Sequence, residues 1–160
     1  MIFVTVGTQL TFDRMIQAVD EWAAKTDEEV VAQIGPSDLK PAHLKWQKFL
    51  SPDEFNAYMK QARVIVAHAG MGSILTALQL QKPIIILPRQ AALKEHRNNH
   101  QIATAERFRE MQGIHVAMNE TEMLIVLQNL SALSASDGVG PYASGELITA
   151  IKDFIEGKSA

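Results

Sequence analysis

The chain has 160 residues, 47% of them apolar, which is the size of one ordinary domain with enough apolar residues to bury a core. Its net charge of −3 provides no basic field to hold a polyanion, which argues against nucleic acid as a partner. It contains no cysteine, which excludes disulfides and cysteine-based metal sites.

Strand and helix signals alternate along the first half of the chain. Three aliphatic or alternating segments predict strands over residues 2–6, 29–34 and 44–50. An amphipathic helix is expected from Asp13 onward, where apolar residues recur at helical spacing. A second helix is expected after Ser51, a good N-cap that is followed by proline and two acidic residues.

The same alternation continues in the second half. Strands are expected over residues 64–67, 84–87 and 114–118, and helices over residues 73–82, 101–112 and 119–130. Residues 1–130 are therefore predicted to form the domain. Residues 131–145 are rich in Ser, Ala and Gly and predict a flexible linker. Residues 146–160 predict an amphipathic C-terminal helix and tail, which packs on its own domain or docks on a partner.

No targeting or membrane segment is expected. The apolar start of the chain lacks the basic flank and the cleavage site of a signal peptide. No apolar run approaches the roughly 20 residues that a spanning helix needs. The sequence thus predicts a cytoplasmic protein that reaches a membrane only through a partner.

Strands that alternate with helices predict right-handed crossovers, and hence an α/β fold with a mostly parallel sheet and helices on both faces. Sheets of this type bind ligands at the carboxyl ends of their strands, where the strand order reverses. Four segments follow predicted strands in this way, namely residues 7–11, 35–37, 68–73 and 88–101.

The glycine-rich turn of residues 68–73 predicts an anion site. Gly70 and Gly72 lie between a buried strand and a helix, whose first N–H groups point outward without acceptors. Ser73 adds a hydroxyl donor. The spacing differs from the dinucleotide fingerprint, and the alternative is a tight turn whose glycines serve packing. For His68, a structural or phosphate-contacting role is favoured over a role as general base.

The turn after the first strand, Gly7-Thr8-Gln9, offers a close backbone approach and two polar side chains. Alternatively, it is an ordinary strand-to-helix turn. The polar segment from Arg89 to Gln101 is dense in groups that suit sugar hydroxyls, unless it is only a solvated helix start. His96 and His100 are four residues apart, a spacing that zinc sites use, but a third ligand is missing. We therefore expect no metal and no other cofactor.

These segments together resemble the C-terminal, donor-binding domain of family 28 glycosyltransferases over residues 1 to about 130. The matching stretches are Phe3-Val-Thr-Val-Gly-Thr8, Phe12-Asp13, His68-Ala-Gly-Met-Gly-Ser73, Lys82-Pro83, Pro88-Arg89 and Glu95-His-Arg-Asn-Asn-His-Gln101. The chain is most similar to the small subunits of two-component enzymes. These include the bacterial exopolysaccharide type and the related subunit of the dolichol-pathway N-acetylglucosaminyltransferase.

The resemblance implies one half of a GT-B fold and transfer of a sugar from a UDP-sugar to a lipid-linked acceptor, in exopolysaccharide or glycolipid synthesis. It implies a membrane-anchored partner subunit that binds the acceptor and supplies the catalytic base. It places Gly7 and Thr8 at the phosphates, the glycine turn on the diphosphate, Phe49 and Leu50 near the uracil, and Glu95, His96 and Asn99 at the sugar. The candidate substrate-binding residues are Gly7, Thr8, Gln9, Phe49, Leu50, His68, Gly70, Met71, Gly72, Ser73, Arg89, Glu95, His96 and Asn99.

One position departs from the family pattern. Many relatives carry an acidic residue on the helix after the glycine turn, where it grips the ribose, and this chain has Thr76 there. The departure keeps an alternative function open, that of a nucleotide-binding or interaction module without transferase activity.

Overall fold

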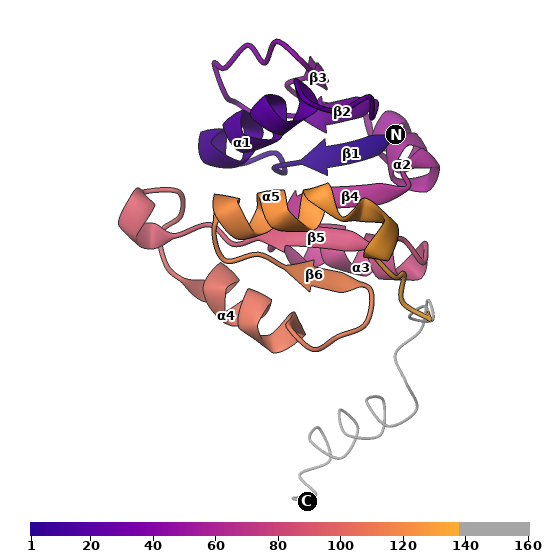
Figure 1. Ribbon diagram of the computed structural model, residues 1–160. Helices are drawn as coiled ribbons and strands as arrows, with labels where there is room; N and C mark the ends of the chain where they lie inside the picture. Colours follow the sequence, from indigo (N-terminus) through magenta and orange to yellow (C-terminus); the bar gives the residue numbers. More distant parts are fainter. Residues whose placement is uncertain (138–160) are drawn as a thin grey trace, which may run out of the picture.

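Six parallel strands form the centre of the computed structural model, which describes residues 1–137 (Figure 1). They are β1 (Ile2–Thr5), β2 (Val30–Gln33), β3 (Lys45–Gln47), β4 (Val64–His68), β5 (Ile84–Leu87) and β6 (Ile114–Val116). Their order in the sheet is β3-β2-β1-β4-β5-β6, and every neighbouring pair is parallel. The predicted parallel sheet is confirmed.

Helices cover both faces of the sheet. They are α1 (Asp13–Ala23), α2 (Pro52–Gln61), α3 (Met71–Gln79), α4 (His100–Phe108) and α5 (Glu120–Gln128), with short 3-10 turns η1 (Ala91–Leu93) and η2 (Leu130–Ala132). The helices α1 and α5 lie together in the foreground of Figure 1. They bury Ile16 and Met123 against Val4, whereas α2, α3 and α4 contribute to a second core around Phe3. Because both faces are covered, the central strands β1, β4 and β5 are buried and mostly apolar rather than alternating, whereas the edge strand β3 is polar and partly exposed.

The strand order reverses between β1 and β4. From β1 the chain continues outward to β2 and β3, and from β4 it continues in the opposite direction to β5 and β6. The loops that follow β1 and β4 therefore diverge at the carboxyl edge of the sheet. This is the place where open parallel sheets accommodate ligands.

Several elements are shorter than the sequence predicts, among them the third strand and α4. The strand expected over residues 44–50 extends only over Lys45–Gln47, although the backbone N–H groups of Ile34 and Gly35 still donate to the carbonyls of Gln47 and Lys48. The helix expected through residue 112 ends at Phe108, which packs into the second core. Tight turns then lead to Gly113, whose φ of +86° favours glycine.

Residues 134–137 lie against the domain. The side chains of Gln81 and Gln112 donate hydrogen bonds to the carbonyls of Asp137 and Ala135. A Cβ on Gly113 would lie 2.4 Å from the backbone nitrogen of Ser136, so this segment packs tightly on the turn before β6. The rest of the predicted linker and the predicted C-terminal helix lie outside the described residues.

Candidate functional site

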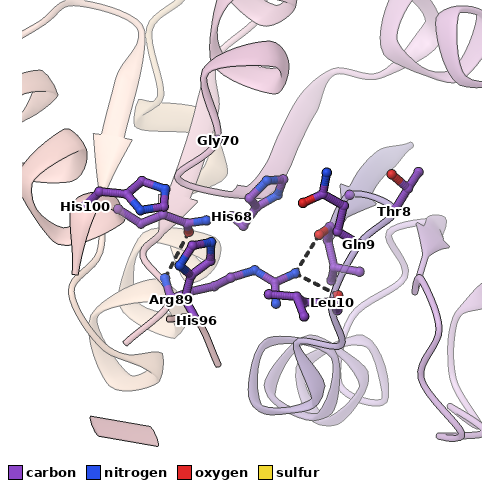
Figure 2. A pocket seen from close by; sticks show the side chains of 11 residues that line it. Thr8, Gln9, Leu10, His68, Gly70, Arg89, His96 and His100 are labelled. Carbon is purple, nitrogen blue, oxygen red and sulfur yellow. Dashed lines mark hydrogen bonds between the residues drawn. The ribbon is translucent and has the colours of Figure 1, made fainter. Parts of the chain in front are cut away.

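A cavity of about 330 Å³ opens at the carboxyl edge of the sheet, where the strand order reverses (Figure 2). It lies between the loops that follow β1, β4 and β5. The residues that line it are Val6, Gly7, Thr8, Gln9, Leu10, His68, Gly70, Arg89, His96, His100 and Gln101. The structure thus brings together three of the four segments that the sequence singles out, without the segment of residues 35–37.

His68, the last residue of β4, fits between two glycines. A Cβ on Gly70 would lie 2.2 Å from Nε2 of His68, and a Cβ on Gly7 would lie 3.0 Å from Cε1 of the same ring. Gly7 also has a φ of +77°, which other residues rarely adopt. Both glycines are therefore needed to admit the imidazole. The interpretation that the glycines of this turn serve packing therefore explains why position 70 is a glycine.

The His68 imidazole is neutral at pH 7. Burial, with the positive charge of Arg89 as a second cause, lowers the pKa of His68 to about 4. Its Nδ1 is buried and has no hydrogen-bond partner within the described part of the chain. A neutral ring can donate or accept a hydrogen bond at the cavity wall, but it lacks the basicity of an ordinary histidine. This favours a ligand-contacting role over one as general base.

The N-terminus of α3 borders the cavity. Gly70 is its N-cap and makes no side-chain capping bond, so the first N–H groups of the helix remain available. A Cβ built on Gly72 would meet no atom within 4 Å. The packing interpretation therefore does not account for Gly72, which stands in open space in the first turn. Met71 is exposed and Ser73 is buried.

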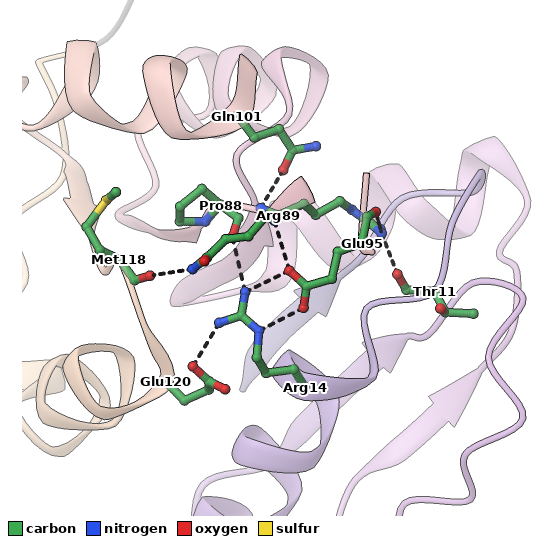
Figure 3. A network of polar contacts seen from close by, with 9 residues as sticks. Thr11, Arg14, Pro88, Arg89, Glu95, Gln101, Met118 and Glu120 are labelled. Carbon is green, nitrogen blue, oxygen red and sulfur yellow. Dashed lines mark hydrogen bonds and ion pairs between the residues drawn. The ribbon is translucent and has the colours of Figure 1, made fainter. Parts of the chain in front are cut away.

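Arg89 lies beneath the cavity, with only 3% of its surface exposed. Its guanidinium donates to the carbonyls of Val6 (2.7 Å) and Leu10 (2.9 Å), and also to that of Thr11. It also stacks over the Phe12 ring, 4.8 Å from the centroid. The hydrogen-bonding groups of Arg89 are thus directed mainly at the loop after β1. They connect that loop to the segment that follows β5 (Figure 3).

Arg14 forms a bidentate ion pair with the carboxylate of Glu95. Arg14 Nε lies 2.8 Å from Oε1 of Glu95, and its Nη2 lies 2.9 Å from Oε2 (Figure 3). The Glu95 carboxylate also accepts from the backbone N–H of Gln90. Burial alone would lower the pKa of Arg14, but bonds to Glu95 and Glu120 raise it. Both oxygens of Glu95 are therefore engaged within the protein.

The other residues of the polar segment lie at the cavity mouth or beside it. His96 and His100 line the cavity, and their rings meet edge to face with centroids 4.4 Å apart. Burial and then the charges of His100 and Arg89 lower the pKa of His96. Asn99 uses its side-chain oxygen to accept from the backbone N–H of Ala91, which stabilises the loop.

Seven residues of the sequence-predicted set do not line this cavity, namely Phe49, Leu50, Met71, Gly72, Ser73, Glu95 and Asn99. Phe49 is exposed, and Leu50 packs against the second core. The Thr76 hydroxyl donates to the Gly72 carbonyl within α3, at 2.8 Å. Val6, Leu10, His100 and Gln101, which line the cavity, are missing from the sequence-predicted set. Leu10 is apolar and gives no chemical signal, whereas Gln101 closes the polar segment that the sequence marks.

Within residues 1–137, no three His, Cys, Asp or Glu side chains gather as a metal ion would require. The same residues include no helix long and apolar enough to cross a membrane.

The arrangement as a whole matches a known domain. The model of the glycosyltransferase family 28 C-terminal domain matches residues 1–133. The chain belongs to this family. The family 28 match ends four residues before the end of the described part of the chain.

Curated relatives of this family 28 chain share one name, UDP-N-acetylglucosamine transferase subunit ALG13. The protein of Eremothecium gossypii is 46% identical over 108 residues, which cover 64% of this chain and 49% of the relative. That of Candida albicans is 30% identical over 88 residues, which cover 54% and 29%. The human protein is 27% identical over 118 residues, which cover 67% and 10%. The chain spans half or less of the length of each.

Solved structures share the fold. The NMR structure of ALG13 has a TM-score of 0.60 at 19% identity and covers 94% of this chain and 93% of its own. The glycotransferase of kitacinnamycin has a TM-score of 0.61 at 23% identity, and the match covers 82% of this chain and 34% of that structure. At these identities, the likeness concerns the fold alone.

Proposed function

We propose that this chain is the donor-binding subunit of a two-component glycosyltransferase and that it binds a UDP-sugar in the cavity between β1 and β4. The observation that carries the proposal is the uncapped N-terminus of α3 at that cavity, with Gly72 in open space. Free N–H groups at a helix N-terminus are suited to phosphate, and the helix dipole favours negative charge by about 0.3–1 kcal/mol.

In this arrangement the diphosphate lies on the first turn of α3, near Gly72 and Ser73. His68, as a neutral ring at the wall, hydrogen-bonds a phosphate oxygen. Gly7, Thr8 and Gln9 line the opposite wall, and His96 lies at the mouth on the side of the sugar. The name of the relatives, UDP-N-acetylglucosamine transferase subunit, supports uridine diphosphate as the nucleotide part.

A partner chain completes the enzyme in this proposal. The word subunit in the relatives' name supports a heteromeric enzyme. We propose that the partner is membrane-anchored, binds a lipid-linked sugar acceptor, supplies the catalytic base and recruits this chain to the cytoplasmic face of the membrane. The lowered pKa of His68 makes its ring a weak base, which supports a base located elsewhere. The proposal requires no metal, so a chelator should leave transfer by the reconstituted pair unchanged.

Isothermal titration calorimetry with UDP and UDP-N-acetylglucosamine tests donor binding. The informative variant is Gly72→Asp, which the open space around Gly72 accommodates without a clash. We expect it to fold normally and to lose at least tenfold in affinity for UDP, because a carboxylate then occupies the phosphate position. The matched control is Gln79→Asp, which adds the same charge in the last turn of α3, on an exposed residue.

A chain that binds neither UDP nor any UDP-sugar, alone or with its partner, would contradict the proposal. Binding without sugar transfer by the reconstituted pair would instead favour a nucleotide-binding module without transferase activity. That alternative has one specific support, because Thr76 stands where relatives carry a ribose-binding acid and its hydroxyl donates within its own helix.

A further inference from the structure

The guanidinium of Arg89 is a buried charge without a carboxylate bonded to it. Its hydrogen bonds go to four backbone carbonyls, those of Val6, Leu10, Thr11 and Glu95. Among residues 1–137, no carboxylate forms an ion pair with it. Buried charges are costly unless they are paired, so this one needs compensation from another source.

The nearest carboxylate is engaged with another cation. Glu95 forms its two-pronged ion pair with Arg14 (Figure 3), and it does not line the cavity. Arg14 takes Glu120 as well, at 2.8 Å. Two carboxylates and two guanidinium groups make this network neutral overall, but both carboxylates bond to Arg14 and neither lines the cavity, whereas Arg89 does.

The positive charge of the Arg89 guanidinium acts on the cavity. Arg89 forms part of the lining, and the groups around it there are uncharged or cationic. The loop after β1 contributes Thr8, Gln9 and Leu10, and the two histidines His68 and His96 have pKa values that the Arg89 charge helps to lower. No acidic side chain among the described residues lines this cavity. The floor of the cavity is therefore positive.

We infer that Arg89 is a positioning residue with two linked effects on an anionic ligand. It holds the carbonyls of the loop after β1, which turns the backbone of Gly7 to Leu10 toward the cavity. It also provides the fixed positive charge that the ligand's diphosphate neutralises, without contacting the diphosphate itself. This inference depends on the proposed function, because it requires a ligand with a phosphate group at this site.

The test compares two ligands that differ only in the diphosphate. UDP and uridine are titrated into the full chain, with affinities from calorimetry for UDP and from NMR shift changes for uridine. In Arg89→Gln, we expect the ratio of UDP affinity to uridine affinity to fall about tenfold, the scale of a screened charge interaction at several ångströms. The NMR-titrated pKa of His96 should rise in the same variant, since one cause of its depression is removed.

For a second variant, Glu95→Gln, we expect the ratio of UDP affinity to uridine affinity to change in the opposite direction. Glu95→Gln removes the negative charge nearest to Arg89 and leaves the loop an uncharged side chain of the same shape. The ratio should therefore rise about threefold. The surface variant Arg63→Gln is the matched control, since Arg63 pairs with Glu28 outside the cavity, and it should leave the ratio unchanged.

A purely structural role for Arg89 predicts another pattern. Both variants would then weaken UDP and uridine binding alike and leave the ratio and the His96 pKa unchanged, which would overturn the inference. If Arg89→Gln does not fold, the Glu95→Gln variant alone decides. In that case the inference is overturned if the ratio of UDP affinity to uridine affinity does not rise in Glu95→Gln. Absence of UDP binding by the unsubstituted chain would instead contradict the proposed function.

Discussion

His68 fits at the end of β4 because the two residues on either side of its ring have no side chains. The ring lies between Gly7 and Gly70, at separations that a Cβ on either would reduce to 3.0 Å or less. Gly72, two residues further along, has open space where a side chain would stand. Two glycines of the same turn thus serve different purposes, one for packing and one for access.

This difference predicts opposite effects of alanine at the two positions. Gly70→Ala should lower the free energy of unfolding by about 1–3 kcal/mol, because the added Cβ would clash with the His68 ring, which must then shift. Gly72→Ala should leave stability unchanged or raise it by up to about 1 kcal/mol, since alanine favours helix. Urea denaturation measures both effects. Equal losses at the two positions would contradict the assignment of Gly72 to ligand access.

The depressed pKa of His68 predicts a specific pH dependence of stability. The unfolded chain binds a proton on this residue near pH 6.5, whereas the folded chain does so only near pH 4. Stability from this source is therefore present above pH 6.5 and is lost as the pH falls toward 4. Between pH 7 and pH 5 the loss should reach about 2 kcal/mol, at about 1.4 kcal/mol per pKa unit.

The measurement is urea denaturation at pH 7 and pH 5, for the unsubstituted chain and for His68→Gln. Glutamine does not titrate, so the variant should lose less stability between the two pH values than the parent. The same decrease in both chains would mean that His68 is not the titrating group.

At the scale of elements, the helices differ in how they begin. Ser51 and Glu54 form a reciprocal capping box at the start of α2, and Asn119 caps α5 by accepting from the backbone N–H of Glu122. The starts of α1, α3 and α4 have no such cap, and of their three N-cap residues only Gly70, at the start of α3, lines the cavity. A side-chain cap satisfies the first N–H groups internally, whereas an uncapped helix keeps them for a ligand.

We therefore expect removal of a cap to affect stability and not ligand binding. Ser51→Ala should lower the free energy of unfolding by about 1 kcal/mol, a typical value for an N-cap serine. The affinity for UDP should remain within twofold of the parent. Thermal unfolding and calorimetry on the same preparation measure the two quantities. A marked loss of UDP affinity would indicate that the loop before α2 also takes part in donor binding.

At the scale of the whole molecule, the architecture could be predicted from local patterns. The aliphatic runs of β4 and β5 and the capping signal at Ser51 indicate strands and helices directly, and their alternation dictates a parallel sheet. The glycine turn also lies at the edge of the sheet where the cavity opens. Contacts of a side chain with distant backbone carbonyls could not be predicted in the same way. Every residue has a carbonyl, so the sequence does not indicate which one a side chain will bind.

Arg89 shows this limit most clearly. The carbonyls of Val6, Leu10 and Thr11 that it binds lie 78 to 83 residues away along the chain. From sequence, its place in a polar segment after a strand suggested direct substrate contact. In the structure the guanidinium is buried behind the loop, and Glu95 pairs with Arg14, 81 residues away. Which polar groups remain free for a ligand depends on such distant pairings.

The extent of the domain leads to a prediction about truncation. Every residue of the two described cores, with the side chains packed against them, lies at or before Leu133, and hydrogen bonds hold the chain as far as Asp137. A chain that ends at Asp137 should therefore fold, with an unfolding midpoint within a few degrees of the parent. A chain that ends at Leu130 should be less stable, because Leu133 and the contacts of residues 134–137 are lost. Circular dichroism on heating distinguishes them.

The packing of His68 between Gly7 and Gly70 has a consequence for evolution. A side chain cannot be introduced at position 70 unless the ring at position 68 is exchanged for something smaller, and the reverse replacement requires glycine to be restored first. The three positions are therefore expected to change together among homologous chains. A homologue that keeps histidine at position 68 and carries a branched residue at position 70 must have moved the helix that begins there.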